Sequence, residues 1–238
     1  MCGRFSCIST PGELAERFSL EGIRAGVLPR YNIAPTDEVA VAANSAPHVL
    51  DVFRWGLVPF WSKDTSPASR LINAALETLT DRPAFRIAWR KRCLIFADGF
   101  YEWHEVRTQR RAVYVRRRDQ APFAFAGIWD SWRSEDGHIL KTCAIVTVPA
   151  SAKVAPVNRR MPALLNPRLF SPWLSPKPTS IVLWQQLLSP QRDEALELFP
   201  VSRYVNKTGN EGPECIAPSH ELFLAAKDEL WPGPLFPS

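Results

Sequence analysis

Residues 93–106 read CLIFADGFYEWHEV, and this run sets the architecture that we expect for the chain. It is rich in the aromatic and aliphatic residues that favour strands, and its Asp98-Gly99 pair is typical of a turn. Runs of similar composition lie on both sides, at residues 48–55, 112–118, 123–132, 141–148 and 180–184. Several strands in succession predict a sheet that curls into a barrel.

Helices are predicted before and after these strands. Thr10-Pro11-Gly12-Glu13 has the residues of a helix start, with Thr10 as N-cap and Glu13 three positions later. Further helices are expected at residues 82–90 and 189–198. The sequence therefore predicts an α+β fold: a single domain, residues 1–230, with a mixed, barrel-like β core surrounded by helices, and an irregular tail at 231–238.

Composition narrows the class of protein. Of 238 residues, 46% are hydrophobic and 22% charged, as in globular proteins, and no apolar run is long enough to span a membrane. The first residues lack the apolar segment of a secretory signal, so we expect a cytoplasmic, nucleoid-associated protein whose five cysteines are reduced. No CxxC pair or HExxH motif occurs, so we expect neither a metal nor another cofactor.

The positive charge consists mostly of arginine. The net charge is +5, 22 of the 29 basic residues are Arg, and nine Trp accompany them. Guanidinium groups bind phosphates and aromatic rings stack on bases, which suits single-stranded nucleic acid. A basic surface over a Trp-rich core would have the same composition, so composition alone leaves both interpretations open.

Met1-Cys2-Gly3 carries the most specific chemistry. Removal of Met1 would leave Cys2 with a free α-amine beside its thiol, and an α-amine with a pKa of about 7.7–8.0 is partly neutral at physiological pH. Such an amine attacks an aldehyde to form an imine, and the thiol then closes onto the imine carbon to give a thiazolidine. The pattern predicts covalent capture of aldehydes, although an arbitrary second residue would look the same.

Two further polar residues lie in apolar surroundings. Asn73 could orient an amine or a sugar through its amide, or it could be an ordinary loop residue. Glu102 lies between aromatic residues, where burial would raise its pKa and suit proton transfer, unless it faces water on an alternating strand. A cluster of arginines between residues 107 and 118 could follow phosphates or cover a solvated ribbon.

Ordered motifs extend over most of the chain: residues 1–5, 31–36, 54–59 with Trp61, 72–74 with 77–78, 97–103, 125–129, 145–147, 160–162 and 200–206. Together they resemble the SOS response-associated peptidase family, also called abasic-site processing proteins. The resemblance implies a barrel-and-helix fold and a protein that binds single-stranded DNA. Nothing in the sequence demands more than a monomer. The resemblance further implies a covalent link to the aldehyde of an abasic site after Met1 is removed, with peptidase and lyase activities as possible accompaniments.

The same resemblance implies roles for individual residues. Cys2 would be the nucleophile, Asn73 would position it, and Glu102 would transfer protons. The residues expected to bind DNA are Arg4, Trp55, Trp61, Thr147 and Arg160.

Two positions depart from the family pattern. Ala75 replaces an arginine that is usual in the family, which removes a phosphate contact. Asn158 occupies a catalytic position at which the family usually has a histidine. An amide cannot shuttle a proton near neutral pH, so we expect weaker DNA binding and a slower chemical step than in a typical member.

Two other functions remain as alternatives. An N-terminal-nucleophile glutamine amidotransferase also begins Met-Cys-Gly, but the later motifs do not fit that class. A protein that binds single-stranded DNA without forming a covalent bond fits the composition and the two departures. Inertness toward glutamine would exclude the first, and a covalent product would exclude the second.

Overall fold

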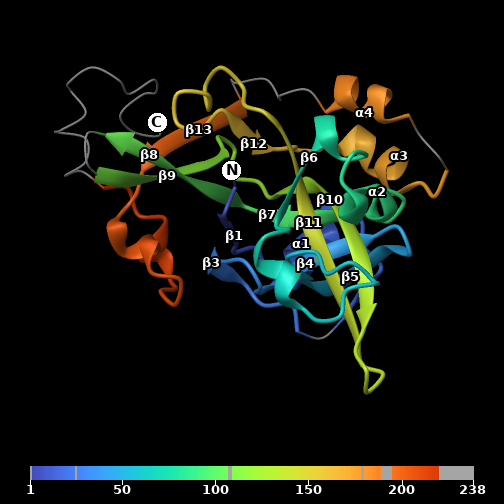
Figure 1. Cartoon of the computed structure of the whole chain (residues 1–238). Helices are drawn as coiled ribbons and strands as arrows, with labels where there is room; N and C mark the ends of the chain where they lie inside the picture. The colour runs from blue at the N-terminus through green and yellow to red at the C-terminus, as the bar shows by residue number, and fades with distance from the viewer. Residues whose placement is uncertain (1, 25, 107–108, 178–179, 189–194, 220–238) are drawn as a thin grey trace.

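A computed structural model describes residues 2–24, 26–106, 109–177, 180–188 and 195–219. Its centre is a β-barrel of five strands, which pair in the order β11–β10–β7–β4–β5 (Figure 1). The barrel closes because β5 also pairs with β11, in parallel, with Cys143 opposite Trp55. The strands are β4 (Glu38–Ala43), β5 (Ala46–Trp55), β7 (Arg92–Ala97), β10 (Phe123–Arg133) and β11 (Ile139–Pro149).

Three short strands extend the barrel sheet, and a second sheet lies beside it. β2 (Gly22–Ile23) pairs with β5, while β6 (Asn73–Ala75) and β12 (Arg160–Pro162) both pair with β11. The second sheet has the order β13–β9–β8–β1–β3. Its strands are β1 (Arg4–Cys7), β3 (Arg30–Ile33), β8 (Gly99–Val106), β9 (Gln109–Arg117) and β13 (Leu196–Pro200).

Short helices complete the described part of the chain. In Figure 1 the helices α2, α3 and α4 lie at the opposite end of the molecule from β8 and β9. The helices are α1 (Pro11–Phe18), α2 (Pro83–Ala88), α3 (Phe170–Leu174) and α4 (Ile181–Leu187), with 3₁₀ turns η1 (Ser66–Ser69), η2 (Leu76–Thr78), η3 (Pro167–Leu169), η5 (Arg203–Asn206) and η6 (Pro213–Cys215). The predicted mixed α+β fold with a barrel core is confirmed.

The start of α1 forms as its sequence predicts. The Thr10 side chain accepts a hydrogen bond from the Glu13 amide, and the Glu13 carboxylate accepts one from the Thr10 amide at 2.7 Å. This reciprocal pair satisfies two amides that a helix leaves without partners at its first turn. The helix predicted at residues 82–90 is also confirmed, as the shorter α2.

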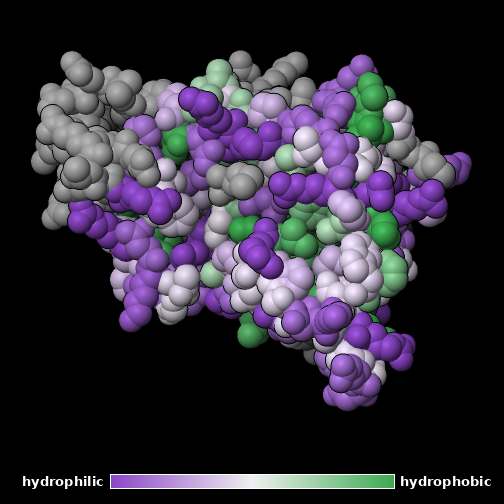
Figure 2. Space-filling model, viewed as in Figure 1, coloured by the Kyte–Doolittle hydropathy of each residue, from purple (hydrophilic) through white to green (hydrophobic). Residues whose placement is uncertain are grey.

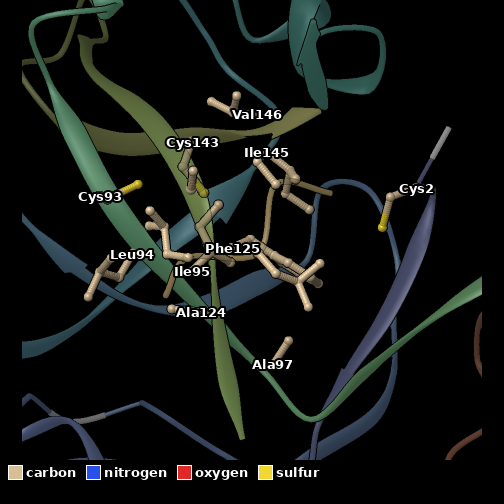
Figure 3. Packing of buried hydrophobic residues seen from close by; sticks show 14 of the residues in the cluster. Cys2, Cys93, Leu94, Ile95, Ala97, Ala124, Phe125, Cys143, Ile145 and Val146 are labelled. Carbon is tan, nitrogen blue, oxygen red and sulfur yellow. The ribbon is translucent and has the colours of Figure 1, made fainter. Parts of the chain in front are cut away.

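Apolar side chains fill the barrel. Figure 3 shows Phe125 and Ile145 among the packed residues, with Cys93 and Cys143 in the same cluster. All five cysteines are free and buried, as expected of small apolar groups in a reduced protein. The interior between these residues is therefore a packed core.

Two segments differ from the prediction. The run 180–184, expected as a strand, forms the N-cap (Ser180) and first turn of helix α4, because Trp184 and Leu188 are buried one turn apart whereas Val182 and Leu183 are exposed. Residues 196–198, expected at the end of a helix, form strand β13, which pairs with β9. Pairing with an existing sheet overrides the local helical preference there. Residues 189–194 of that predicted helix, and the tail at 231–238, lie outside the described residues.

The Asp98-Gly99 turn links the two sheets. Chain direction changes here between β7 and β8, and the Asp98 carboxylate accepts hydrogen bonds from the amides of Ile8 and Ser9 at 2.6 and 3.0 Å. Gly99 packs so closely against Tyr114 that a Cβ atom would lie 2.2 Å from its Cζ. The tyrosine hydroxyl is itself within hydrogen-bonding distance, 2.7 Å, of the Ser6 hydroxyl.

We therefore expect Gly99→Ala to destabilise the protein strongly. The ring of Tyr114 is buried and cannot move without breaking its contact with Ser6, so the overpacked site should cost about 3 kcal/mol or more. Urea denaturation measures this loss. Gly12→Ala is the control, because a Cβ at Gly12 in α1 would meet nothing within 4 Å. Equal stability of the two variants would contradict the prediction.

Candidate functional site

Cys2 lies directly before β1, at the edge of the apolar core (Figure 3). Its side chain is completely buried, and its Sγ atom lies 3.7 Å from the Arg4 carbonyl oxygen, to which the thiol donates. Burial raises the pKa of the thiol well above its usual value, and the negative charge of Glu102 raises it further. At neutral pH the thiol is therefore protonated and held in a fixed place.

Asn73 binds the same segment from strand β6. Because β6 pairs with β11 of the barrel, the asparagine is fixed at the point where β1 begins. Its Nδ2 atom donates to the Cys2 carbonyl at 2.7 Å, which places the two predicted residues in direct contact. Its Oδ1 atom is buried and has no hydrogen-bond partner among the described residues, so one strong acceptor remains available at this place.

Glu102 is buried in the middle of the second sheet. Strand β8 lies between β1 and β9, with Tyr101 opposite Arg4, so the carboxylate lies beside the first residues of the chain. The side chain is 2% exposed, and the alternative of a water-facing glutamate is wrong. Burial raises its pKa, as predicted, although the positive amino terminus and a hydrogen bond from Asn158 act in the opposite direction. A carboxyl group with a raised pKa keeps its proton to a higher pH than a free carboxyl group and can therefore act as a general acid.

Asn158 completes this group from the loop between β11 and β12. Its Nδ2 atom donates to Glu102 Oε2 at 2.7 Å, and its Oδ1 atom accepts from the Arg160 amide at 3.1 Å. Both ends of the amide are thus used to hold the loop and the carboxylate. This contact orients Glu102 but supplies no titratable group of its own.

Arg160 and Thr147 lie together on adjacent strands. The Arg160 guanidinium donates to the Thr147 carbonyl at 2.7 Å and to the Glu77 carboxylate at 2.9 Å. Ala75 is opposite Thr147 in the register of β6 and β11, so the position of the missing arginine lies beside this cluster. The cation of Arg160 is partly neutralised by Glu77, a residue to which the sequence assigned no role.

Arg4 is nearly buried, on strand β1. Its NH1 atom donates to Asn32 Oδ1 at 2.6 Å and to the Val205 carbonyl at 3.0 Å, and its Cζ atom lies 5.7 Å from the centre of the Trp103 ring. No carboxylate of the described residues forms a salt bridge with it. The sequence predicts no role for Asn32 or Trp103, and the structure reveals that both contact Arg4, which was predicted to bind DNA.

The two predicted tryptophans lie in different environments. The Trp55 ring is completely buried, packs edge-on against Phe5, and donates from Nε1 to the Ile72 carbonyl at 3.0 Å. It has no free face, so the expectation that it contacts DNA is corrected: Trp55 supports the barrel wall. Trp61 is 45% exposed and packs edge-on against Phe60, which is 54% exposed, in a loop outside the Cys2 group.

The visible surface of the protein is mainly polar. The face shown in Figure 2 is largely hydrophilic, with apolar residues in small separate areas. Within the described ranges, no three His, Cys, Asp or Glu side chains come close enough to hold a metal ion. Helices of the described segments are too short, or too polar, to cross a membrane.

Comparison with known proteins identifies the family. The family model for SOS response associated peptidase (SRAP) matches residues 1–208. Abasic site processing protein YoqW of Bacillus subtilis is 34% identical over 221 residues, which cover 91% of this chain and 99% of YoqW. Abasic site processing protein HMCES of Pongo abelii is 28% identical, over 97% of this chain and 78% of HMCES.

A solved structure supports the fold. A protein from Bacteroides thetaiotaomicron superimposes with a TM-score of 0.82 at 23% identity, covering 92% of this chain and 100% of that one. At this identity the likeness concerns the fold alone. The family model and the YoqW match together extend over the barrel, the second sheet and all the site residues described above. The chain therefore belongs to the SOS response associated peptidase (SRAP) family.

Proposed function

We propose that this protein processes abasic sites in single-stranded DNA by forming a thiazolidine between Cys2 and the aldehyde of the damaged sugar. The observation that carries the proposal is the convergence of Cys2, Asn73 and Glu102, from three separate strands or strand ends, around the first residues of the chain. Relatives named abasic site processing proteins supply the substrate class.

The chemistry begins when Met1 is removed and the Cys2 amine becomes free. The peptidase activity that we propose would cleave this Met1–Cys2 peptide bond. The amine attacks C1′ of the ring-opened deoxyribose, and the resulting hydroxyl leaves as water to give an imine. The thiol sulfur then adds to the imine carbon, and its proton passes to the nitrogen. One water is released overall, and no oxidant or cofactor is required.

The surrounding side chains fit these proton movements. Asn73 Oδ1 accepts a hydrogen bond from the Cys2 amine, and this contact orients the nitrogen lone pair toward the aldehyde. Glu102, with its raised pKa, protonates the departing hydroxyl and then takes up a proton from the thiol or amine. All of these groups belong to one chain, so the proposed site is complete in a monomer.

The DNA strand would follow the cations beside Cys2. Arg4 lies on β1 beside β8, and Arg160 lies on β12, which pairs with the same strand, β11, as the β6 strand that carries Asn73. The exposed Trp61 and Phe60 rings offer a surface on which bases stack. A single strand suits this site, because its sugar can enter with the aldehyde exposed and no base pair or stack has to be broken.

A second candidate is reversible DNA binding without a covalent product. The observation that favours it is Asn158, whose amide holds Glu102 but cannot transfer a proton. A denaturing gel separates the two candidates. We expect a heat-stable shifted band when the protein is mixed with single-stranded DNA carrying one abasic site, and none with undamaged DNA. Binding without a band would support the second candidate.

Ala75→Arg should restore a phosphate contact. The new cation would lie beside Thr147 and Arg160, so affinity for single-stranded DNA should rise several-fold, and the plot of log K against log salt should steepen by about 0.7. Fluorescence anisotropy at several salt concentrations measures both, with Ala75→Gln as an uncharged control. An unchanged slope would show that no phosphate passes this position.

Glu102→Gln should slow crosslinking but stabilise the fold. The folded-state pKa of Glu102 is raised, so its stabilising contribution is complete below its unfolded pKa of about 4.3 and is lost as pH rises through the folded value. Relative to the neutral glutamine, the wild type should thus melt at a lower temperature at pH 7, and the difference should vanish toward about pH 4. Crosslinking should slow about 10²-fold.

Thermal melts between these pH values measure the stability effect. The exposed Glu16→Gln in α1 provides the control and should leave the melting temperature unchanged. A Glu102→Gln variant that is less stable than the wild type at pH 7 would contradict a buried carboxylate with a raised pKa.

A further inference from the structure

A pocket of about 400 Å³ opens beside the first residues of β1. Its volume is within the range of small-molecule sites and far exceeds that of one water, about 30 Å³. It is lined by Gly3, Arg4, Trp103, Arg110 and Asn206, a set with two cations and no acidic side chain. This composition suits a ligand that is both anionic and planar.

Arg4 provides the strongest indication of an anion. The side chain is only 7% exposed, its Nε atom is buried without a hydrogen-bond partner among the described residues, and no described carboxylate pairs with it. A buried guanidinium that lacks a counter-charge is costly. A phosphate in the pocket would supply the missing counter-charge.

Asn32 fixes the direction of this guanidinium. Its side chain is completely buried on β3; Oδ1 accepts from Arg4, while Nδ2 donates to the carbonyls of Lys207 and Asn210 at 3.0 and 2.8 Å. NH1 of Arg4 is occupied by Asn32 and by the Val205 carbonyl, and Nε is buried, so the NH2 group is the donor left for a ligand. Asn32 is thus a positioning residue that holds Arg4 and the 205–210 segment together.

Trp103 provides a flat wall. Its indole Nε1 donates to Asn206 Oδ1 at 2.8 Å, which fixes the ring at the pocket mouth. The Cζ atom of Arg110 lies 6.0 Å from the centre of this ring, and that of Arg4 lies 5.7 Å from it. Indole rings and guanidinium planes are the surfaces on which nucleobases stack.

We propose that this pocket binds the nucleotide next to the abasic site, with its phosphate on Arg4 and its base against Trp103 and Arg110. This inference rests on the proposed function, which places the neighbouring abasic sugar on Cys2. Gly3 and Arg4 follow Cys2 directly, and consecutive Cα atoms are about 3.8 Å apart, so the pocket is within reach of an adjoining nucleotide. The pocket gives the protein a preference for a base on one side of the lesion.

The test changes the DNA and the protein together. Oligonucleotides carry one abasic site whose 5′ or 3′ neighbour is either a normal nucleotide or a tetrahydrofuran spacer, which has a phosphate and sugar but neither base nor aldehyde. With wild-type protein, the spacer on one side should slow crosslinking about tenfold at limiting protein, and the spacer on the other side should have little effect. Trp103→Leu should be slow with normal DNA and insensitive to the spacer.

Two variants keep the result interpretable. Trp103→Phe retains an aromatic ring without the bond to Asn206 and should regain part of the sensitivity to the spacer. Arg133→Ala, which removes an exposed arginine at the end of β10, should behave as the wild type. Equal effects of the two spacers, no effect of either, or a Trp103→Leu variant that still responds to the spacer would overturn the pocket assignment.

The experiment tests the pocket assignment and the covalent crosslink separately, because either can be wrong while the other holds. If the wild type forms a crosslink that neither spacer slows, the proposed function stands and the pocket assignment falls. If no crosslink forms, the same oligonucleotides are compared by reversible binding to Cys2→Ala. A one-sided, Trp103-dependent loss of affinity would then support the pocket while the thiazolidine mechanism fails.

Discussion

Replacing Cys2 with alanine abolishes the covalent product with abasic DNA while leaving reversible binding within about twofold, if the mechanism is as proposed. Alanine keeps the amine but removes the sulfur that closes the ring, so only a reversible imine can form. The phosphate-binding side chains are unchanged, because Arg4 is held by Asn32 and Val205 rather than by Cys2. Denaturing gels and fluorescence anisotropy measure the two effects separately.

The matched control is Cys7→Ala. Cys7 is also a buried, free cysteine of the first strand, but its thiol lies at the far end of β1 from the proposed site. This variant should form the crosslink normally. A heat-stable adduct of Cys2→Ala, equal in yield to that of the wild type, would show that another residue captures the aldehyde.

Asn158→His should accelerate crosslinking about 10²-fold, the lower end of what one acid–base group contributes. The asparagine already donates to Glu102 at 2.7 Å, so an imidazole at this position would face the same carboxylate and could pass protons to and from it. The pH–rate profile should gain a second titration near the usual histidine pKa of about 6.5.

Asn158→Gln distinguishes this chemistry from a change in packing. Glutamine retains an amide but still cannot transfer a proton, so it should not accelerate the reaction. If the histidine variant is no faster than the glutamine variant, and its pH profile gains no new step, then proton transfer at position 158 does not limit the rate.

The strands that the sequence predicts correctly are those with strong local signals. Residues 48–55, 123–132 and 141–148 form long runs rich in apolar residues, and the Asp98-Gly99 pair has the usual residues for a change of direction. Short strands were missed: β6 has three residues and exists because β11 offers it a partner. The apolar run at 180–184 is compatible with helix or strand, and only the burial of Trp184 against α3 decides between them.

The sequence names the candidate residues of the site, but it does not predict the contacts between them. The chemistry of Cys2 and the apolar context of Glu102 are visible in the chain, whereas the bond between Asn158 and Glu102 joins residues 56 positions apart. Asn32 lies in a quoted motif, yet nothing local indicates that it holds Arg4. Trp55 was misassigned because a tryptophan that stacks on DNA and one that fills a core look alike in sequence.

Intact mass spectrometry of the product tests the central claim most directly. After reaction of the wild type with an abasic oligonucleotide, we predict a species whose mass equals the chain without Met1 plus the oligonucleotide minus one water, and whose DNA-bearing peptide begins at Cys2. A fully processed protein that binds the DNA but yields only the two separate masses, or an adduct on any other residue, would contradict it.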